Sequence, residues 1–134
     1  MFEVLQPPEW PRPKGYANGI AIEGSGKFVV LAGQIGSNDQ GQVDSDDFAV
    51  QVRWCLKNIV KLLAQTGGKP TDIVRMTWFV TDKQAYLASG RAVGEAYREL
   101  VGRHFPTMSV IFVSALLEDR AKVEIEATAF IGDH

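Results

Sequence analysis

Glu124 is a candidate general base. Apolar and polar residues alternate over residues 121–131, which predicts a strand with Glu124 and Glu126 on its polar face. A carboxylate can orient a water molecule and accept its proton when its pKa suits the reaction. The alternative is a structural acid paired with Lys122 or Arg120, and the residues alone favour it because acidic side chains on exposed strands are common.

Two further residues have the character of a binding site. Tyr16 follows a segment with four prolines, Pro7, Pro8, Pro11 and Pro13, which predicts an extended arm. The arm can present the tyrosine to a cleft, or the ring can simply pack the arm on the sheet, and the second reading is favoured. Gly33 lies in a predicted strand, where it either lets a ligand approach the backbone or marks a bulge.

The remaining reactive side chains are sparse. Arg103, His104 and Arg120 flank the last two predicted strands and are candidate anion contacts, although a solvated loop charge is the stronger reading for each. Cys55 belongs to an apolar helical stripe and is expected to fill the core. A single cysteine with only His104 and His134 argues against a metal site, and no phosphate or dinucleotide fingerprint is present, so no cofactor is expected.

Composition places the chain among single-domain proteins. It has 134 residues, of which 46% are hydrophobic and 22% charged, and its net charge is −2. The balance of charge argues against nucleic-acid binding as the main task. No apolar run is long enough for a membrane span, and the N-terminus does not resemble a signal peptide, so one cytoplasmic domain over residues 1–134 is expected, with residues 1–15 as the arm.

Hydrophobic periodicity predicts an α+β fold. Short strands are expected at residues 20–22, 28–35, 73–80, 108–114 and 121–131, with residues 24–26 as a tight hairpin turn between the first two. Residues 28–35 are almost continuously apolar, which favours burial on both faces. Helices are expected at residues 46–66 and 83–101, and they can cover one face of a single mixed sheet. The other face, which carries Glu124, is left for a partner subunit.

The predicted helices carry clear end signals. Asp44 or Ser45 is expected to cap the first helix, with Asp46 and Asp47 in its first turn and a glycine pair, residues 67–68, at its end. In the second helix, Gly90 and Gly94 leave one face bare. Close packing on the sheet is the favoured reason, and room for a ligand is the alternative.

Six sequence blocks together resemble the Rid (YjgF/L-PSP) family. They are Gly15-Tyr16-Ala17-Asn18-Gly19, Ala32-Gly33-Gln34-Ile35-Gly36, Asp72-Ile73-Val74, Phe79-Val80-Thr81-Asp82, Phe105-Pro106 and Lys122-Val123-Glu124-Ile125-Glu126-Ala127. The resemblance spans most of the chain and implies a chorismate-mutase-like fold and a homotrimer with a central barrel and clefts between subunits. It also implies hydrolysis of reactive enamines or imines to a carbonyl compound and ammonia.

Three of the family's cleft positions are matched and three are not. The resemblance assigns the cleft tyrosine to Tyr16, the cleft glycine to Gly33 and the cleft glutamate to Glu124. The arginine that holds the substrate carboxylate is replaced by Met108, and the other two departures are Val110 for a cysteine and Gly94 for an asparagine. Methionine cannot form the bidentate pair of an arginine, so a larger or less acidic small-molecule substrate is expected.

Two other functions remain open at this point. The cleft can bind a small metabolite without turning it over, which the three departures favour. The family also carries an endoribonuclease label, which the mild acidity and the single internal histidine argue against.

Overall fold

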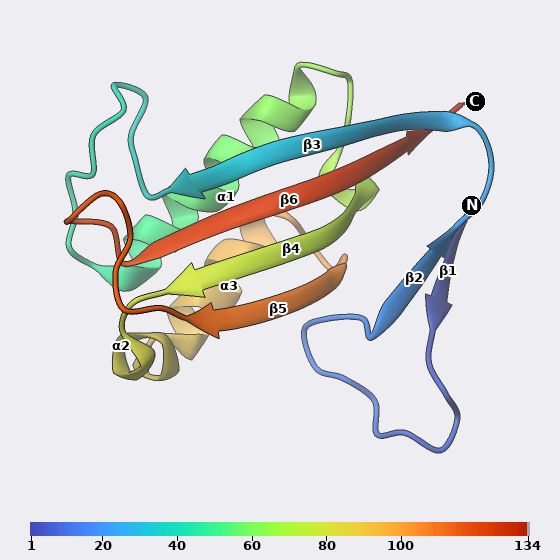
Figure 1. Ribbon diagram of the computed structural model, residues 1–134, viewed down its shortest axis with the longest axis horizontal. Helices are drawn as coiled ribbons and strands as arrows, with labels where there is room; N and C mark the ends of the chain where they lie inside the picture. The colour runs from blue at the N-terminus through green and yellow to red at the C-terminus, as the bar shows by residue number, and fades with distance from the viewer. Residues whose placement is uncertain (134) are drawn as a thin grey trace.

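The computed structural model describes residues 1–133, so His134 lies outside the described residues. A four-stranded sheet forms the centre, in the order β3 (Gly26–Ile35), β6 (Val123–Gly132), β4 (Ile73–Val80) and β5 (Thr107–Phe112). β6 runs antiparallel to both of its neighbours, and the edge strand β5 runs parallel to β4 (Figure 1). The predicted mixed sheet is confirmed.

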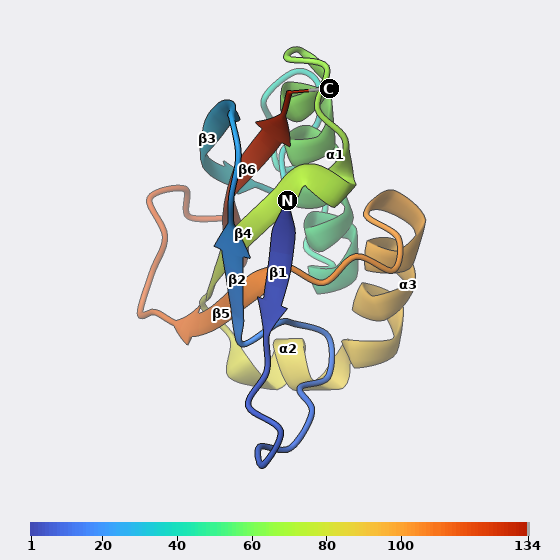
Figure 2. The same ribbon diagram turned by 90° about the vertical axis from the view of Figure 1, so that its right-hand side faces the viewer.

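The helices lie on one face of this sheet, as predicted. Figure 2 shows α1 (Phe48–Ala64) and α3 (Gly90–Leu100) on the same side of the strands, with the short α2 (Lys83–Ala88) near the end of the layer. The expected apolar stripe of α1 is buried and forms the core with the strands: Phe48, Val52, Cys55, Leu56, Ile59 and Leu63. None of the helices in residues 1–133 has the length and apolarity needed to cross a membrane.

Both helix predictions need correction at their ends. α1 begins at Phe48, and its cap is Asp47, whose carboxylate accepts a hydrogen bond from the Val50 amide at 3.0 Å. The Ser45 hydroxyl instead accepts a hydrogen bond from the amide of Asp47, the capping residue, at 3.1 Å, so Ser45 lies before the cap. The second predicted helix is two helices, because the chain leaves helical geometry at Ser89.

The N-terminal strands differ from the predicted hairpin. β2 (Gly19–Ile22) pairs with β1 (Phe2–Leu5), a strand that the proline-rich arm did not suggest, and these two form a separate ribbon (Figure 1). β3 pairs with β6 instead, so residues 24–26 connect two sheets and do not form a hairpin turn. A single 3-10 turn, η1 (Pro70–Asp72), leads into β4.

The prediction that β3 is buried on both faces is wrong for a single chain. Phe28 is 63% exposed and Val30 is 78% exposed, and both lie on the sheet face opposite the helices. The helices of the described chain all lie on the other side of the sheet (Figure 2), so these apolar side chains are left uncovered by any helix. A face of this kind is typical of a protein–protein contact.

The Cys55 side chain behaves as the sequence indicates. It is fully buried, and its thiol lies 3.8 Å from the Val123 carbonyl oxygen. Burial, with a smaller contribution from the charge of Glu124, raises the pKa of this thiol far above its ordinary value. A buried thiol of raised pKa is not a nucleophile near neutral pH.

Candidate active site

Glu124 lies on the uncovered face of the sheet, in the middle strand β6. Its register partners are Ile35 on β3 and Phe79 on β4, while its neighbours Val123 and Ile125 point into the core. The carboxylate rests against Gly33, because a side chain at that glycine would place its Cβ 2.6 Å from Glu124 Cδ. A larger residue at position 33 would therefore displace the carboxylate from its place.

Gly33 also marks a bulge. The pairing of β3 with β6 shifts between Leu31 and Gln34, so Ala32 and Gly33 interrupt the regular ladder. Bulges often re-aim a side chain or the backbone near a functional site. The bulge, one of the two readings from the sequence, is therefore present at Gly33, and the glycine also leaves room for the Glu124 side chain.

The structural-acid alternative for Glu124 is not what the structure shows. The Arg120 guanidinium donates to the Val43 carbonyl and, at 2.9 Å, to the Asp46 carboxylate. This hydrogen bond and the arginine charge lower the pKa of Asp46 below its ordinary value. Among residues 1–133, neither Arg120 nor Lys122 forms an ion pair with Glu124.

A buried glutamine fixes the entry to β6. The Gln51 side chain amide donates to the carbonyls of Ser45 at 2.8 Å and Arg120 at 3.1 Å, and its oxygen accepts from the Lys122 amide at 2.8 Å. Gln51 is completely buried, and the Lys122 amide that it binds lies two residues before Glu124. Sequence reasoning missed it, because a glutamine on the apolar side of a helix gives no periodic signal.

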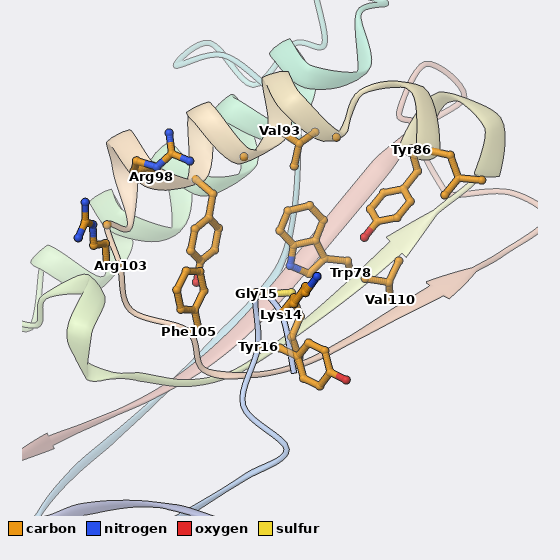
Figure 3. A pocket seen from close by; sticks show the side chains of 16 residues that line it. Lys14, Gly15, Tyr16, Trp78, Tyr86, Val93, Arg98, Arg103, Phe105 and Val110 are labelled. Carbon is orange, nitrogen blue, oxygen red and sulfur yellow. The ribbon is translucent and has the colours of Figure 1, made fainter. Parts of the chain in front are cut away.

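A cavity lies beside β5 on the helix side of the sheet. It has a volume of about 620 Å³ and opens between α2, α3, β5 and the arm (Figure 3). Five residues singled out from the sequence line it: Tyr16, Gly94, Arg103, Met108 and Val110. The arm is held there by the Ala17 amide, which donates to the Pro106 carbonyl at 3.0 Å.

The two glycines of α3 border this cavity. Gly90 and Gly94 both line it, and a Cβ added at either position would meet no atom within 4 Å. Close packing of these glycines on the sheet, the favoured expectation, is therefore wrong. The space that they leave belongs to the pocket.

The register places Glu124 and the pocket on opposite faces of one sheet. Met108 and Val110 pair with Met76 and Trp78, which point toward the helices, whereas Glu124 pairs with Phe79 on the other face. Gly33 and Glu124 are therefore together, and the five pocket residues are together, but one chain does not join the two groups. Arg120 belongs to neither group.

His104 has a structural setting. One ring nitrogen lies 2.6 Å from the Ile73 carbonyl oxygen, and the His104 carbonyl accepts from the Tyr97 hydroxyl at 2.6 Å. Burial raises the pKa of Tyr97, so its hydroxyl stays a donor near neutral pH. The histidine thus ties the loop before β5 to β4.

Several pocket residues were not singled out from the sequence. Lys14 and Arg98 line the cavity, and so does Trp78, which the sequence placed only within the predicted strand at residues 73–80. No sequence pattern separates a core tryptophan from one that borders a cavity. That distinction depends on where α3 crosses the edge of the sheet.

The sequence is similar to proteins of a known family. The family model described as Endoribonuclease L-PSP matches residues 11–131. The chain belongs to the Rid (YjgF/L-PSP) family. A 2-iminobutanoate/2-iminopropanoate deaminase of Escherichia coli K12 is 35% identical over 115 residues, 85% of this chain and 85% of that protein. A RutC family protein of Pyrococcus horikoshii is 30% identical over 132 residues, covering 97% of this chain and 98% of its own length.

Solved Rid structures share the fold. YyfB of Yersinia pestis, a Rid family protein of unknown function, superposes with a TM-score of 0.84 at 26% identity, covering 97% of this chain and 98% of that one. The YjgF protein of E. coli gives a TM-score of 0.65 at 33% identity, with 86% and 87% covered. The fold expected from the resemblance is thereby confirmed.

Proposed function

We propose that this Rid protein is a deaminase that hydrolyses a reactive enamine or imine to a carbonyl compound and ammonia. The observation that carries the proposal is the Glu124 carboxylate, which lies on the uncovered sheet face against Gly33 with no ion pair among residues 1–133. Relatives named as imine deaminases support the same reaction class.

The reaction needs one base and one water molecule. Glu124 accepts a proton from water as the water oxygen forms a bond to the electrophilic carbon of the C=N group, and Glu124 then passes this proton to the nitrogen, which gives a carbinolamine. The carbinolamine's hydroxyl proton moves to the amino nitrogen through the same carboxylate as the C–N bond breaks, so that ammonia leaves, the carbonyl forms and Glu124 is again ionised. An enamine enters the same route after protonation at carbon. No cofactor or metal is required.

We propose that the working cleft lies between subunits of a cytoplasmic homotrimer. Glu124 and Gly33 of one chain would face the pocket of the next, where Tyr16 stands at the rim with its hydroxyl turned away from the Trp78 indole (Figure 3). The exposed apolar residues Phe28 and Val30 on the Glu124 face support burial of that face by a second copy.

The substrate is expected to differ from small 2-imino acids. Met108 occupies the position that the family resemblance gives to the carboxylate-binding arginine, and with Val110 and Gly94 it gives the pocket an apolar wall. Ammonia release should therefore be faster with large imines than with 2-iminobutanoate. Release from no imine or enamine in a broad panel would contradict the proposed function.

Replacing Met108 by arginine should restore use of small 2-imino acids. The guanidinium can bind the carboxylate through two hydrogen bonds, which is expected to raise kcat/KM for 2-iminobutanoate at least about tenfold. Met108→Leu is the matched control, because it keeps the apolar volume. Steady-state rates measured on freshly generated 2-iminobutanoate check the prediction, and equal rates for the two variants would refute it.

Binding of a metabolite without turnover is the second candidate. The large pocket and its apolar residues Met108 and Val110 favour it, since none of the five expected pocket residues is a carboxylate. RNA cleavage stays third, because the net charge is −2 and His104 is held by backbone groups. Saturable binding with no ammonia release would favour the second candidate.

A further inference from the structure

The Trp78 indole holds a hydrogen-bond donor with no partner. Trp78 is only 3% exposed, and its Nε1 is the one buried side-chain nitrogen or oxygen of residues 1–133 that lacks a hydrogen bond. An indole nitrogen can only donate, and a buried donor left without a partner is unfavourable. Such an atom beside a cavity is typical of a contact that a ligand completes.

The charged residues that line the same cavity are all basic. Lys14, Arg98 and Arg103 line it, and no aspartate or glutamate does. None of the three cations is in an ion pair within the described part of the chain. Figure 3 shows Lys14 extending from the arm toward the middle of the pocket, and the nitrogen end of the indole turned toward the arm. In a chain of net charge −2, this grouping favours an anionic ligand.

The rest of the wall is apolar and aromatic. Tyr86, Val93, Met108 and Val110 surround the indole, and the volume of about 620 Å³ is that of a site for a molecule much larger than a two- or three-carbon acid. Gly94 adds open space on the α3 side. The shape therefore fits a flat or branched apolar body attached to one acidic group.

We propose that this pocket binds an aryl-alkyl carboxylate, whose carboxylate accepts the Trp78 Nε1 hydrogen bond and faces Lys14, while its aryl group lies among the apolar side chains. In this proposal the contact to the ligand's carboxylate is made by Trp78 on β4 and Lys14 in the arm. The family resemblance would place it at position 108 on β5. That the bound acid is the substrate rests on the proposed deaminase function; binding itself does not.

The test compares 3-phenylpropanoate with its neutral amide, 3-phenylpropanamide, by isothermal titration calorimetry. We expect the acid to bind at least about tenfold more tightly than the amide, because a hydrogen bond to a charged group is stronger than one to a neutral group. Equal affinities, or no binding of the acid at millimolar concentration, would overturn the proposal.

Trp78→Phe removes the donor and keeps an aromatic ring, and Trp54→Phe is the control outside the pocket. Trp78→Phe should weaken acid binding about tenfold while the melting temperature is unchanged or higher, because the unpaired donor is gone. A purely structural tryptophan would give a lower melting temperature and unchanged affinity. Should Trp78→Phe fail to fold, Lys14→Met in the exposed arm should weaken binding of the acid severalfold and leave that of the amide unchanged.

The two proposals fail in different ways. Glu124→Gln should keep acid binding and lose ammonia release. Acid binding without turnover of any imine would overturn the deaminase function and support the pocket assignment. Turnover that depends on Glu124 but is indifferent to Trp78→Phe with aryl-alkyl imino acids would overturn the pocket assignment alone.

Discussion

Glu124→Gln is expected to lower ammonia release by at least about a hundredfold, with little change in KM. Glutamine has the same size as glutamate and can still hydrogen-bond a water molecule, but it cannot take up the proton of that water. General base catalysis contributes about 100- to 10,000-fold. Initial rates at saturating imine, measured with a coupled ammonia assay, check the result.

Glu126→Gln is the matched control for this variant. Glu126 is on the same strand and the same sheet face, two residues further along, and it is paired in register with Thr77. The same chemical change there should leave kcat within about twofold. A loss of similar size in both variants, or full activity in Glu124→Gln, would show that Glu124 is not the base.

Gln51→Leu is expected to destabilise the protein by about 3 kcal/mol. The leucine leaves the Ser45 and Arg120 carbonyls and the Lys122 amide without their partner inside the structure. For a chain of this size, the melting temperature should fall by roughly 10 °C. Thermal unfolding followed by circular dichroism measures the change.

Gln84→Leu controls for the loss of an amide as such. Gln84 is exposed on α2, so its replacement should change the free energy of unfolding by less than about 0.5 kcal/mol. If Gln51→Leu unfolds at the wild-type temperature, the three hydrogen bonds do not hold the entry to β6. The account of how Glu124 is positioned would then need another anchor.

Hydrophobic periodicity correctly predicted the elements whose buried faces are set by local apolar spacing. Residues 73–80 were predicted as a strand and form β4 with those bounds, and the α1 stripe around Cys55 and Leu56 is the core that spacing indicated. The pairing of β1 with β2 was not predictable in this way, because proline content describes the arm but not its partner. Likewise, the break between α2 and α3 at Ser89 gave no signal in the apolar spacing.

For the candidate site too, the sequence identified single residues but not their neighbours in space. Glu124 and Gly33 were singled out as separate residues, and only the register of β3 on β6 shows that one makes room for the other. Trp78 alternates with Met76 and Val80 as a core residue should, and its unpaired nitrogen is visible only beside the cavity. The spacing of apolar residues shows on which face of a strand a side chain lies. It does not show whether that face packs against the core, borders a cavity or is exposed.

The division of the site between two faces of the sheet gives the most direct test. Glu124→Gln and Tyr16→Ala chains, each expected to be nearly inactive alone, are mixed by refolding them together, and ammonia release is measured. If the cleft joins Glu124 of one subunit to the pocket of its neighbour in a homotrimer, about a quarter of the clefts in random mixtures contain both native residues. Recovery of about a quarter of the wild-type rate is therefore expected. A mixture that stays as inactive as its two components would contradict it.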